Sequence, residues 1–178
     1  MQIWNSYLNK FTKLDEKNNY DMYVCGVTPY DTAHVGHGAT FTYFDTLIYH
    51  LEHNLGKTVN YVQNITDIDD SIIAKAKDIN VNIFDLAKTQ TEKLVTSMQR
   101  LGLRKPNKMP KVSEKIAEII EAAETLNKNG YLYQIDNDWY FDYTKTIDKL
   151  PDLHLSNQVL SEIYNNRGGN TEIKGKRN

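Results

Sequence analysis

Two β-rich segments separated by one helical segment constrain the fold of this chain more than any other feature. Residues 20–26 combine aromatic and β-branched side chains and stop at Gly26, and a second strand is predicted at residues 58–62. Residues 38–51 between them have the apolar spacing of a helix. A crossover of this length joins parallel strands in a right-handed βαβ unit. We therefore predict that the two strand ends, near Cys25 and Thr66, open on the same edge of a sheet.

The remainder of the sequence predicts helices and one hairpin. Apolar stripes indicate helices over residues 72–76, over 84–101 after a cap at Asn82, and over 113–130. The aromatic segments 131–134 and 139–143, separated by a polar turn, indicate a β-hairpin. We expect no third crossover strand after Lys145. The predicted class is α/β, with a nucleotide-binding parallel sheet that is incomplete at the C-terminus and a helical and hairpin insertion.

Composition and charge limit the functional classes. The chain has 178 residues, 40% of them hydrophobic and 25% charged, as expected for one globular domain. The formal charge of −2 gives no overall basic footprint for nucleic acid. Two local basic stretches, residues 100–111 and 174–177, either bind a polyanion or are a solvated face and a loose terminus. Nothing in the sequence specifies an oligomeric state.

A single cysteine, Cys25, excludes an internal disulfide and fits a reducing cytoplasm. The N-terminal residues resemble neither a signal peptide nor a membrane span. We therefore expect a cytoplasmic protein without a membrane partner.

His34 and His37 lie where the loop after the first strand enters the helix. Gly36 between them leaves space for a flat ring to approach the backbone. Helix N-terminal amides and imidazole donors favour phosphate oxygens, so this arrangement is consistent with ATP. From the residues alone, a pair of surface histidines and a two-histidine metal face remain alternatives.

Three sequence blocks, in this order, resemble the cysteinyl-tRNA synthetase family. They are MYVCGVTPYD at residues 22–31, HVGH at His34 to His37, and YVQNITDIDD at residues 61–70. The similarity extends over the whole chain. It implies a Rossmann-like class I catalytic domain, of which residues 1–178 are the N-terminal half, with the first βαβ unit at about 20–81 and the helices and hairpin insertion at about 82–178.

The resemblance also implies an activity and the residues that carry it. The enzyme would condense L-cysteine with ATP, accompanied by Mg²⁺, to cysteinyl adenylate and transfer cysteine to tRNA(Cys). His34 and His37 would be catalytic and stabilise the phosphates as charge develops. The residues implied to bind ATP are Thr28, His34, Gly36 and His37, and those implied to bind the amino acid are Cys25, Gly26 and Thr66.

By the same resemblance, Cys25 is a zinc ligand whose metal binds the thiolate of the substrate. Zinc holds sulfur at roughly 2.3 Å, a bond that a hydroxyl does not match. From chemistry alone, a lone cysteine is more often a small buried hydrophobe. The family's remaining ligands are expected downstream, so we expect one ligand here. His50 and His53 are expected to face solvent instead.

Polar residues surround the second strand end. Thr66, with Asn64 and Asp67 nearby, is where the resemblance implies contact with the amino acid. Asp69 and Asp70 are either a helix cap and an acidic surface or ligands of magnesium.

The sequence also departs from the family. The second class I signature, Lys-Met-Ser-Lys-Ser, is absent, so we expect this chain alone to be inactive or nearly so. The ending at residues 174–178 resembles a truncation. Two alternatives stay open. One is the cysteine ligase of mycothiol synthesis, which delivers cysteine to an amino-sugar and to which residues 28–31, 38–40 and 167–169 have some similarity. The other is a non-catalytic, truncated binding module.

Overall fold

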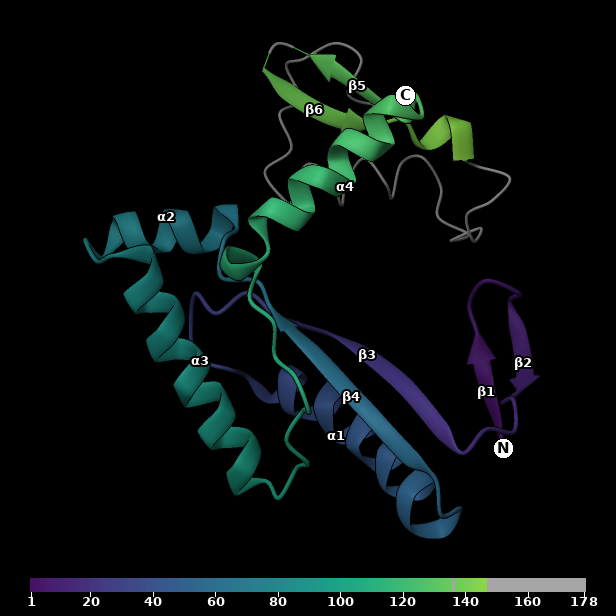
Figure 1. Cartoon of the computed structure of the whole chain (residues 1–178). Helices are drawn as coiled ribbons and strands as arrows, with labels where there is room; N and C mark the ends of the chain where they lie inside the picture. The colour runs from purple at the N-terminus through teal and green to yellow at the C-terminus, as the bar shows by residue number, and fades with distance from the viewer. Residues whose placement is uncertain (136, 147–178) are drawn as a thin grey trace. The chain divides into compact units, whose positions relative to one another are not determined.

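The computed structural model describes residues 1–135 and 137–146 (Figure 1). Its contacts divide the chain into two compact units, one of residues 16–116 and one that joins residues 1–15 to residues 117 onward. The predicted basic stretch at 174–177 and the segment 167–169 lie outside the described residues.

The unit of residues 16–116 is built on the predicted βαβ unit. Strand β3 (Asn19–Val27) and strand β4 (Thr58–Ile65) pair in parallel, and helix α1 (Val35–Tyr49) connects them (Figure 1). The register runs from Asn19 opposite Thr58 to Val24 opposite Gln63, and then shifts so that Val27 lies opposite Ile65. This irregularity lies immediately before the strand ends at which the candidate site is built.

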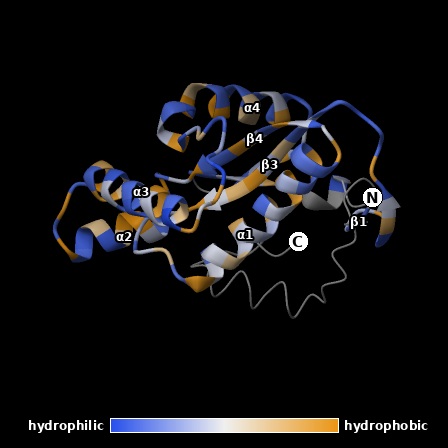
Figure 2. Cartoon of the chain, turned by 90° about the horizontal axis from the view of Figure 1, so that it is seen from below, coloured by the Kyte–Doolittle hydropathy of each residue, from blue (hydrophilic) through white to orange (hydrophobic). Residues whose placement is uncertain are grey.

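One face of the β3–β4 pair is buried. Burial alternates along β4, because successive side chains of a strand point to opposite faces of the sheet. Helix α1 lies along this pair in both ribbon views (Figures 1 and 2). The buried side chains are Val24 and Val27 from β3, Phe41 and Ile48 from α1, and Val59, Tyr61, Gln63 and Ile65 from β4.

Helix α1 ends in a π-helical turn at His50–Asn54. His53 is exposed and packs its ring on Tyr49, with ring centroids 4.3 Å apart. His50 is half-buried, and its Nδ1 lies 3.0 Å from Nδ2 of Asn54. His53 thus faces solvent as predicted, whereas His50 is only partly exposed.

The two helices that follow β4 agree with the predicted pattern. Helix α2 (Asp70–Asp78) and helix α3 (Ile83–Arg100) pack against each other through Ile72, Ala76, Leu86 and Ala87. Asn82 caps α3 as predicted, because its Oδ1 accepts hydrogen bonds from the amides of Phe84 and Asp85. Asp69 caps α2 in the same way, so the cap alternative is confirmed for this residue.

A short third strand segment, which the sequence did not predict, pairs with β4. Lys108 and Lys111 form parallel bridges with Val62 and Ile65, on the edge of β4 that β3 does not occupy. The amide of Gln63 donates to the Lys108 carbonyl at 3.1 Å, and the amide of Ile65 donates to the Pro110 carbonyl at 2.9 Å. A third parallel segment therefore extends this edge of β4 well before Lys145, whereas residues 147–178, on which the expectation falls, lie outside the described residues. The lysines and proline of this segment are not typical of a strand, so the sequence did not predict one, although proline is tolerated on an edge strand.

The other unit contains two hairpins and a helix. Strands β1 (Gln2–Asn5) and β2 (Lys10–Lys13) form an antiparallel pair that was not predicted, with Trp4 and Phe11 packed edge to face. After the 3₁₀ turn Val112–Glu114, helix α4 (Ile116–Lys128) and the hairpin of β5 (Leu132–Ile135) and β6 (Asp138–Phe141) follow as predicted, and the 3₁₀ turn Tyr143–Thr146 ends the description. Among the described residues, every helix is too short or too polar to cross a membrane.

Candidate functional site

The carboxyl ends of β3 and β4 meet at one edge, as predicted. The amide of Thr66 donates a hydrogen bond to the carbonyl of Val27 at 2.9 Å, which ties the two strand ends together beyond their last paired residues. Cys25 is exposed at this edge, and Gly26 and Thr66 are half-buried. The three residues that sequence reasoning assigned to the amino acid therefore belong to one small region.

Asn64 connects these strand ends with its side chain. Its Oδ1 accepts hydrogen bonds from the Gly26 amide and from the Tyr23 hydroxyl, both at 2.8 Å. Its Nδ2 donates to Oγ1 of Thr66 at 3.1 Å. Sequence reasoning noted Asn64 as a neighbour of Thr66 but gave it no role, because its partners on β3 lie about forty positions earlier in the chain.

Gly26 is required by the same close approach. A Cβ at this position would lie 1.5 Å from the backbone oxygen of Asn64, far inside any contact distance. The glycine therefore permits the irregular pairing of β3 with β4. Its predicted contact with the amino acid stays a prediction.

His34 and His37 together form a capping box at the N-terminus of α1. Nδ1 of His34 accepts a hydrogen bond from the Gly36 amide at 3.1 Å, and Nδ1 of His37 accepts one from the His34 amide at 3.2 Å. A ring nitrogen that accepts carries no proton, so each neutral imidazole holds its proton on Nε2. The two rings stack with centroids 3.9 Å apart. The pair thus offers Nε2–H donors at a helix N-terminus, which is an arrangement suited to anions.

The surroundings of His37 also favour the neutral form of its ring. Burial of His37, and next the proximity of His34, lower the pKa of His37 below its usual value of 6.5. Gly36 serves the stack, because a Cβ there would lie 2.9 Å from Cε1 of His34. The predicted reason for Gly36, room for a nucleotide ring, stays a prediction. In the structure, the absence of a side chain at Gly36 leaves room for the His34 ring.

A small pocket brings Thr28 and His37 together. Its lining comes from the end of β3, the loop that follows, α1 and α3, and consists of Val27, Thr28, Pro29, Asp31, Ala33, His37, Gln90 and Leu94. The Oε1 atom of Gln90 is buried and has no hydrogen-bond partner among the described residues. Gln90 was missed in the sequence because it lies on a polar position of an amphipathic helix. The structure singles out Gln90 because its buried Oε1 has no hydrogen-bond partner among the described residues.

The sequence relationships agree with this geometry. Residues 11–178 match the family described as tRNA synthetases class I (C) catalytic domain. The chain belongs to this family. The predicted resemblance is confirmed, and so is a Rossmann-like α/β fold with a parallel sheet.

Individual relatives in this family include both types of cysteine ligase considered above. The chain is 40% identical over 149 residues to the chloroplastic/mitochondrial cysteine–tRNA ligase of Arabidopsis thaliana, covering 83% of the chain and 25% of that protein. It is 37% identical over 170 residues to the cysteine–tRNA ligase of Archaeoglobus fulgidus, covering 94% and 36%. It is 33% identical over 181 residues to the L-cysteine:1D-myo-inositol 2-amino-2-deoxy-alpha-D-glucopyranoside ligase of Corynebacterium kroppenstedtii, covering 99% and 35%. The chain thus spans 25% to 36% of the length of these relatives.

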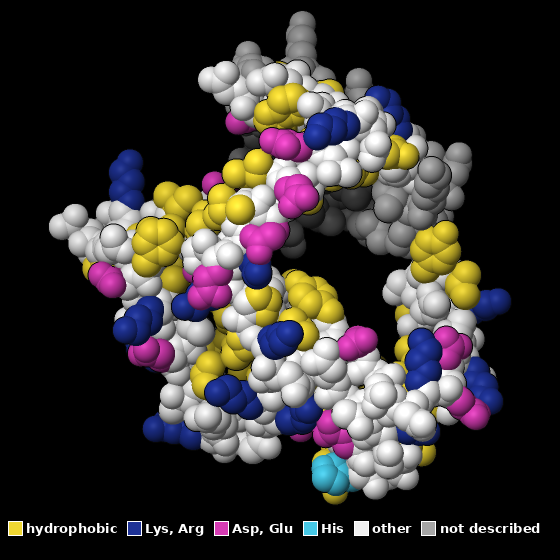
Figure 3. All heavy atoms as spheres, in the orientation of Figure 1, with side chains coloured by type: hydrophobic (Ala, Val, Ile, Leu, Met, Phe, Trp, Pro, Cys, Tyr) yellow, Lys and Arg dark blue, Asp and Glu magenta, His cyan; other side chains and the backbone are white. Residues whose placement is uncertain are grey.

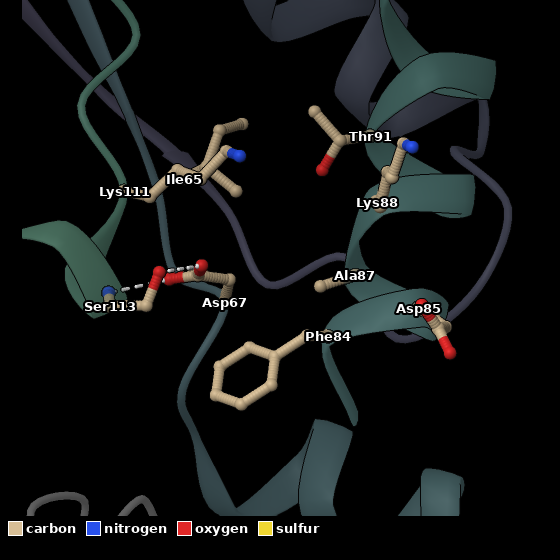
Figure 4. Close-up of a pocket in the computed structure, with 9 residues that line it drawn as sticks. All are labelled: Ile65, Asp67, Phe84, Asp85, Ala87, Lys88, Thr91, Lys111 and Ser113. Atoms are coloured by element: carbon tan, nitrogen blue, oxygen red, sulfur yellow. Dashed lines mark hydrogen bonds between the residues drawn. The ribbon is translucent and has the colours of Figure 1, made fainter. Parts of the chain in front are cut away.

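A second pocket of the synthetase domain lies beyond the end of β4 (Figure 4). Asp67 and Lys111 line it on one side and residues of α3, including Lys88 and Thr91, on the other. Asp67 is only 3% exposed and accepts hydrogen bonds from both the amide and the hydroxyl of Ser113. Its carboxylate therefore fixes the chain that leaves the third strand segment. Ser113 was missed because it lies 46 positions from Asp67.

The predicted basic stretch at residues 100–111 is partly structural. Figure 3 shows Lys and Arg side chains over α3 and the segment that follows it, interspersed with acidic, neutral and hydrophobic side chains. Arg104 turns inward, and its contacts are the Asp45 carboxylate (from its amide), the Val59 carbonyl, the Asn107 side chain and the Glu52 carboxylate. Burial and Asp45 raise the pKa of Tyr61 above its usual value of 10.0, and Arg104 opposes this rise. Lys105 and Lys108 remain exposed.

Metal-binding residues are sparse in the part of the domain that the structure describes. Residues 1–135 and 137–146 contain no group of three or more His, Cys, Asp or Glu side chains placed to hold a metal ion. Cys25 is a free, exposed thiol. Structural and catalytic zinc sites use three or four protein ligands, so Cys25 with its described neighbours does not form a zinc site.

Proposed function

We propose that the chain is the N-terminal half of the catalytic domain of a longer enzyme that activates L-cysteine with ATP to cysteinyl adenylate and transfers cysteine to tRNA(Cys). The observation that carries the proposal is the mutual capping of His34 and His37, which leaves two Nε2–H donors at the N-terminus of α1. Membership in the class I family implies the use of ATP. The cysteine–tRNA ligases among the relatives support cysteine and tRNA as the other substrates.

Adenylate formation needs placement and charge stabilisation more than protein nucleophiles. The substrate carboxylate attacks the α-phosphorus of ATP and pyrophosphate leaves, so the carboxylate oxygen forms the new bond as the bond to the β-phosphate oxygen breaks. His34 and His37 would donate hydrogen bonds to phosphate oxygens as negative charge shifts toward pyrophosphate. Mg²⁺ would accompany ATP. Thr28 and Gly36 would complete the ATP site.

The amino acid would bind at the joined strand ends. Cys25, Gly26 and Thr66 lie there, within one hydrogen-bonded region. Cys25 is proposed as one ligand of a zinc ion that recognises the substrate thiolate. Because the described residues do not complete a zinc site, no step of the mechanism is derived through zinc. The cytoplasm stays the proposed compartment, in keeping with a single free cysteine.

An amino-sugar is the alternative acceptor of cysteine. The mycothiol-type ligase of Corynebacterium kroppenstedtii aligns with 99% of the chain at 33% identity, so the residues of this half do not separate the two acceptors. The separating assay uses the longer protein with radiolabelled cysteine and offers either tRNA or the amino-sugar. Label on the amino-sugar alone would replace the proposed acceptor. A non-catalytic binding module is the remaining alternative, and the ATP experiment below addresses it.

Calorimetry with ATP tests the role of the histidine pair. His34→Asn and His37→Asn keep an acceptor for the capping amides but remove the ring donor, and His53→Asn at the far end of α1 is the matched control. We expect ATP affinity to fall about tenfold or more in the first two variants, as for loss of a hydrogen bond to a charged group, and to change little in the control. The longer protein should also show cysteine-dependent exchange of pyrophosphate into ATP. Equal affinity in all four proteins would refute the histidine assignment, and absence of exchange despite ATP binding would favour the binding module.

A further inference from the structure

The orientation of the Asn64 carboxamide is fixed by one of its partners. A backbone amide only donates hydrogen bonds, so the atom that faces the Gly26 amide at 2.8 Å must be the oxygen Oδ1. The nitrogen Nδ2 must then face Oγ1 of Thr66, at 3.1 Å. The Tyr23 hydroxyl, which also donates to Oδ1, agrees with this orientation.

This orientation determines what the Thr66 hydroxyl can do. Because Nδ2 of Asn64 only donates, Thr66 must accept that hydrogen bond with a lone pair of its oxygen. Its own proton is then left for another partner, and the described residues provide no acceptor for it. Thr66 is half-buried at the edge where the strand ends meet, and its hydroxyl shares the Asn64 carboxamide with the Gly26 amide.

We propose that Asn64 is a positioning residue that holds Thr66 as a hydrogen-bond donor toward an acceptor atom of the bound amino acid. The inference rests on the proposed function, because it takes the amino acid as the ligand of this edge. Two anionic atoms of cysteine have the required chemistry, a carboxylate oxygen and the thiolate sulfur. Asn64 itself acts through Thr66 and through the Gly26 amide.

The decisive variant is Asn64→Asp, which changes one atom of the side chain. Its carboxylate still accepts from the Gly26 amide and the Tyr23 hydroxyl, but it has no N–H for Thr66. The Thr66 hydroxyl then turns to donate to the introduced carboxylate and is lost to the substrate. We expect the KM for L-cysteine in pyrophosphate exchange by the longer protein to rise about tenfold or more, with the KM for ATP unchanged within about twofold.

A double-mutant cycle separates this effect from simple charge repulsion. Thr66→Val removes the hydroxyl and should raise the KM for cysteine to a similar extent. In the Thr66→Val background, Asn64→Asp should add little, because its effect passes through the hydroxyl. Thr66→Ser should restore nearly normal KM. If Asn64→Asp retains its full effect in the Thr66→Val background, repulsion explains it and the positioning role is refuted.

A matched control addresses damage to the strand. Asn60 lies on the same face of β4 and donates to Asp21 at 2.8 Å, so Asn60→Asp places two carboxylates together and weakens the same strand pair. It should lower stability while leaving the ratio of the two KM values unchanged. An equal rise of both KM values in Asn64→Asp would show a purely structural role and overturn the inference.

The two anionic groups of the ligand are separated with a truncated inhibitor. Cysteamine has the thiol but no carboxylate, so its inhibition constant should be insensitive to Asn64→Asp if Thr66 contacts the carboxylate and should rise if Thr66 contacts the thiolate. A wild-type protein without cysteine-dependent exchange would overturn the proposed function and this inference together. An active wild type in which Asn64→Asp changes neither KM would overturn the inference alone.

Discussion

Gly26 is the residue at which the two strands leave no space for a side chain. A Cβ there would lie 1.5 Å from the Asn64 backbone oxygen, and a backbone atom cannot move aside as the end of a flexible side chain could. We predict that Gly26→Ala forces the strand ends apart and lowers the free energy of unfolding by about 3 kcal/mol or more, in the range of overpacked cores. Urea unfolding followed by circular dichroism measures this, and faster exchange of the Thr66 amide should accompany it.

Gly38 gives the matched control for this change. Its Cβ would lie 3.8 Å from Cδ1 of Leu101, an ordinary contact, and the residue lies inside α1. Gly38→Ala should therefore stabilise the chain by about 0.5–1 kcal/mol through helix propensity. Equal effects of the two substitutions would show that the close approach at Gly26 is not a constraint.

The histidine stack predicts a dependence of stability on pH. The pKa of His37 is lowered in the folded state, so folding favours the neutral ring. Its contribution is fully present above the unfolded pKa of 6.5 and is lost as pH falls through the lower folded value. The same protonation removes the Nδ1 acceptor that caps the His34 amide.

The measurement is the unfolding free energy at pH 7.5 and 5.5, for the wild type and for His37→Asn. The wild type should lose more stability on acidification than the variant, because Asn keeps a capping acceptor but does not titrate. The histidines outside the pair are common to both proteins and cancel, so the comparison reports the His34–His37 pair. A variant that loses as much as the wild type would place the pH dependence elsewhere.

At the scale of elements, Arg104 connects the segment after α3 to the sheet. Its guanidinium donates to the Val59 carbonyl at 3.0 Å and pairs with Glu52 at 3.2 Å, and its side chain is 29% exposed. Arg104→Ala should lower the free energy of unfolding by about 2 kcal/mol, as for hydrogen bonds to a charged group that is partly screened by solvent. Arg104→Lys keeps the charge but lacks the planar fork, so it should recover less than half of the loss. Urea unfolding of the three proteins checks this order, and full recovery by lysine would show that charge alone acts.

The elements that were predicted are those with a periodic pattern of their own. The βαβ unit, helices α2 to α4 and the hairpin of β5 and β6 each show alternation, helical spacing or turn residues. The hairpin of β1 and β2 consists of strands of four residues each with a largely exposed surface, so it lacks an apolar pattern. The third strand segment owes its placement to hydrogen bonds with β4, which no local pattern in residues 107–111 encodes.

At the scale of the whole molecule, the sequence predicted those parts of the candidate site whose residues lie close together in the chain. His34, Gly36 and His37 form their capping arrangement within four residues, so spacing alone placed them correctly at a helix start. The ties from Asn64 to β3 and from Asp67 to Ser113 join residues 38 to 46 positions apart. Such contacts depend on how strands are brought together, so they required the structure. They also fix the strand ends at which we propose that the amino acid binds.

Zinc binding tests how much of the metal chemistry this chain carries. The sequence has one cysteine, and a single thiolate holds zinc far more weakly than a set of three or four ligands. We predict that calorimetric titration of the chain with Zn²⁺ shows no tight one-to-one binding and that chelators leave its thermal midpoint unchanged. The longer protein should bind one zinc ion tightly and lose it in Cys25→Ser, while Cys25→Ser in the chain alone should change nothing measurable. Tight stoichiometric binding by the chain, abolished by Cys25→Ser, would mean that residues within 1–178 complete the site.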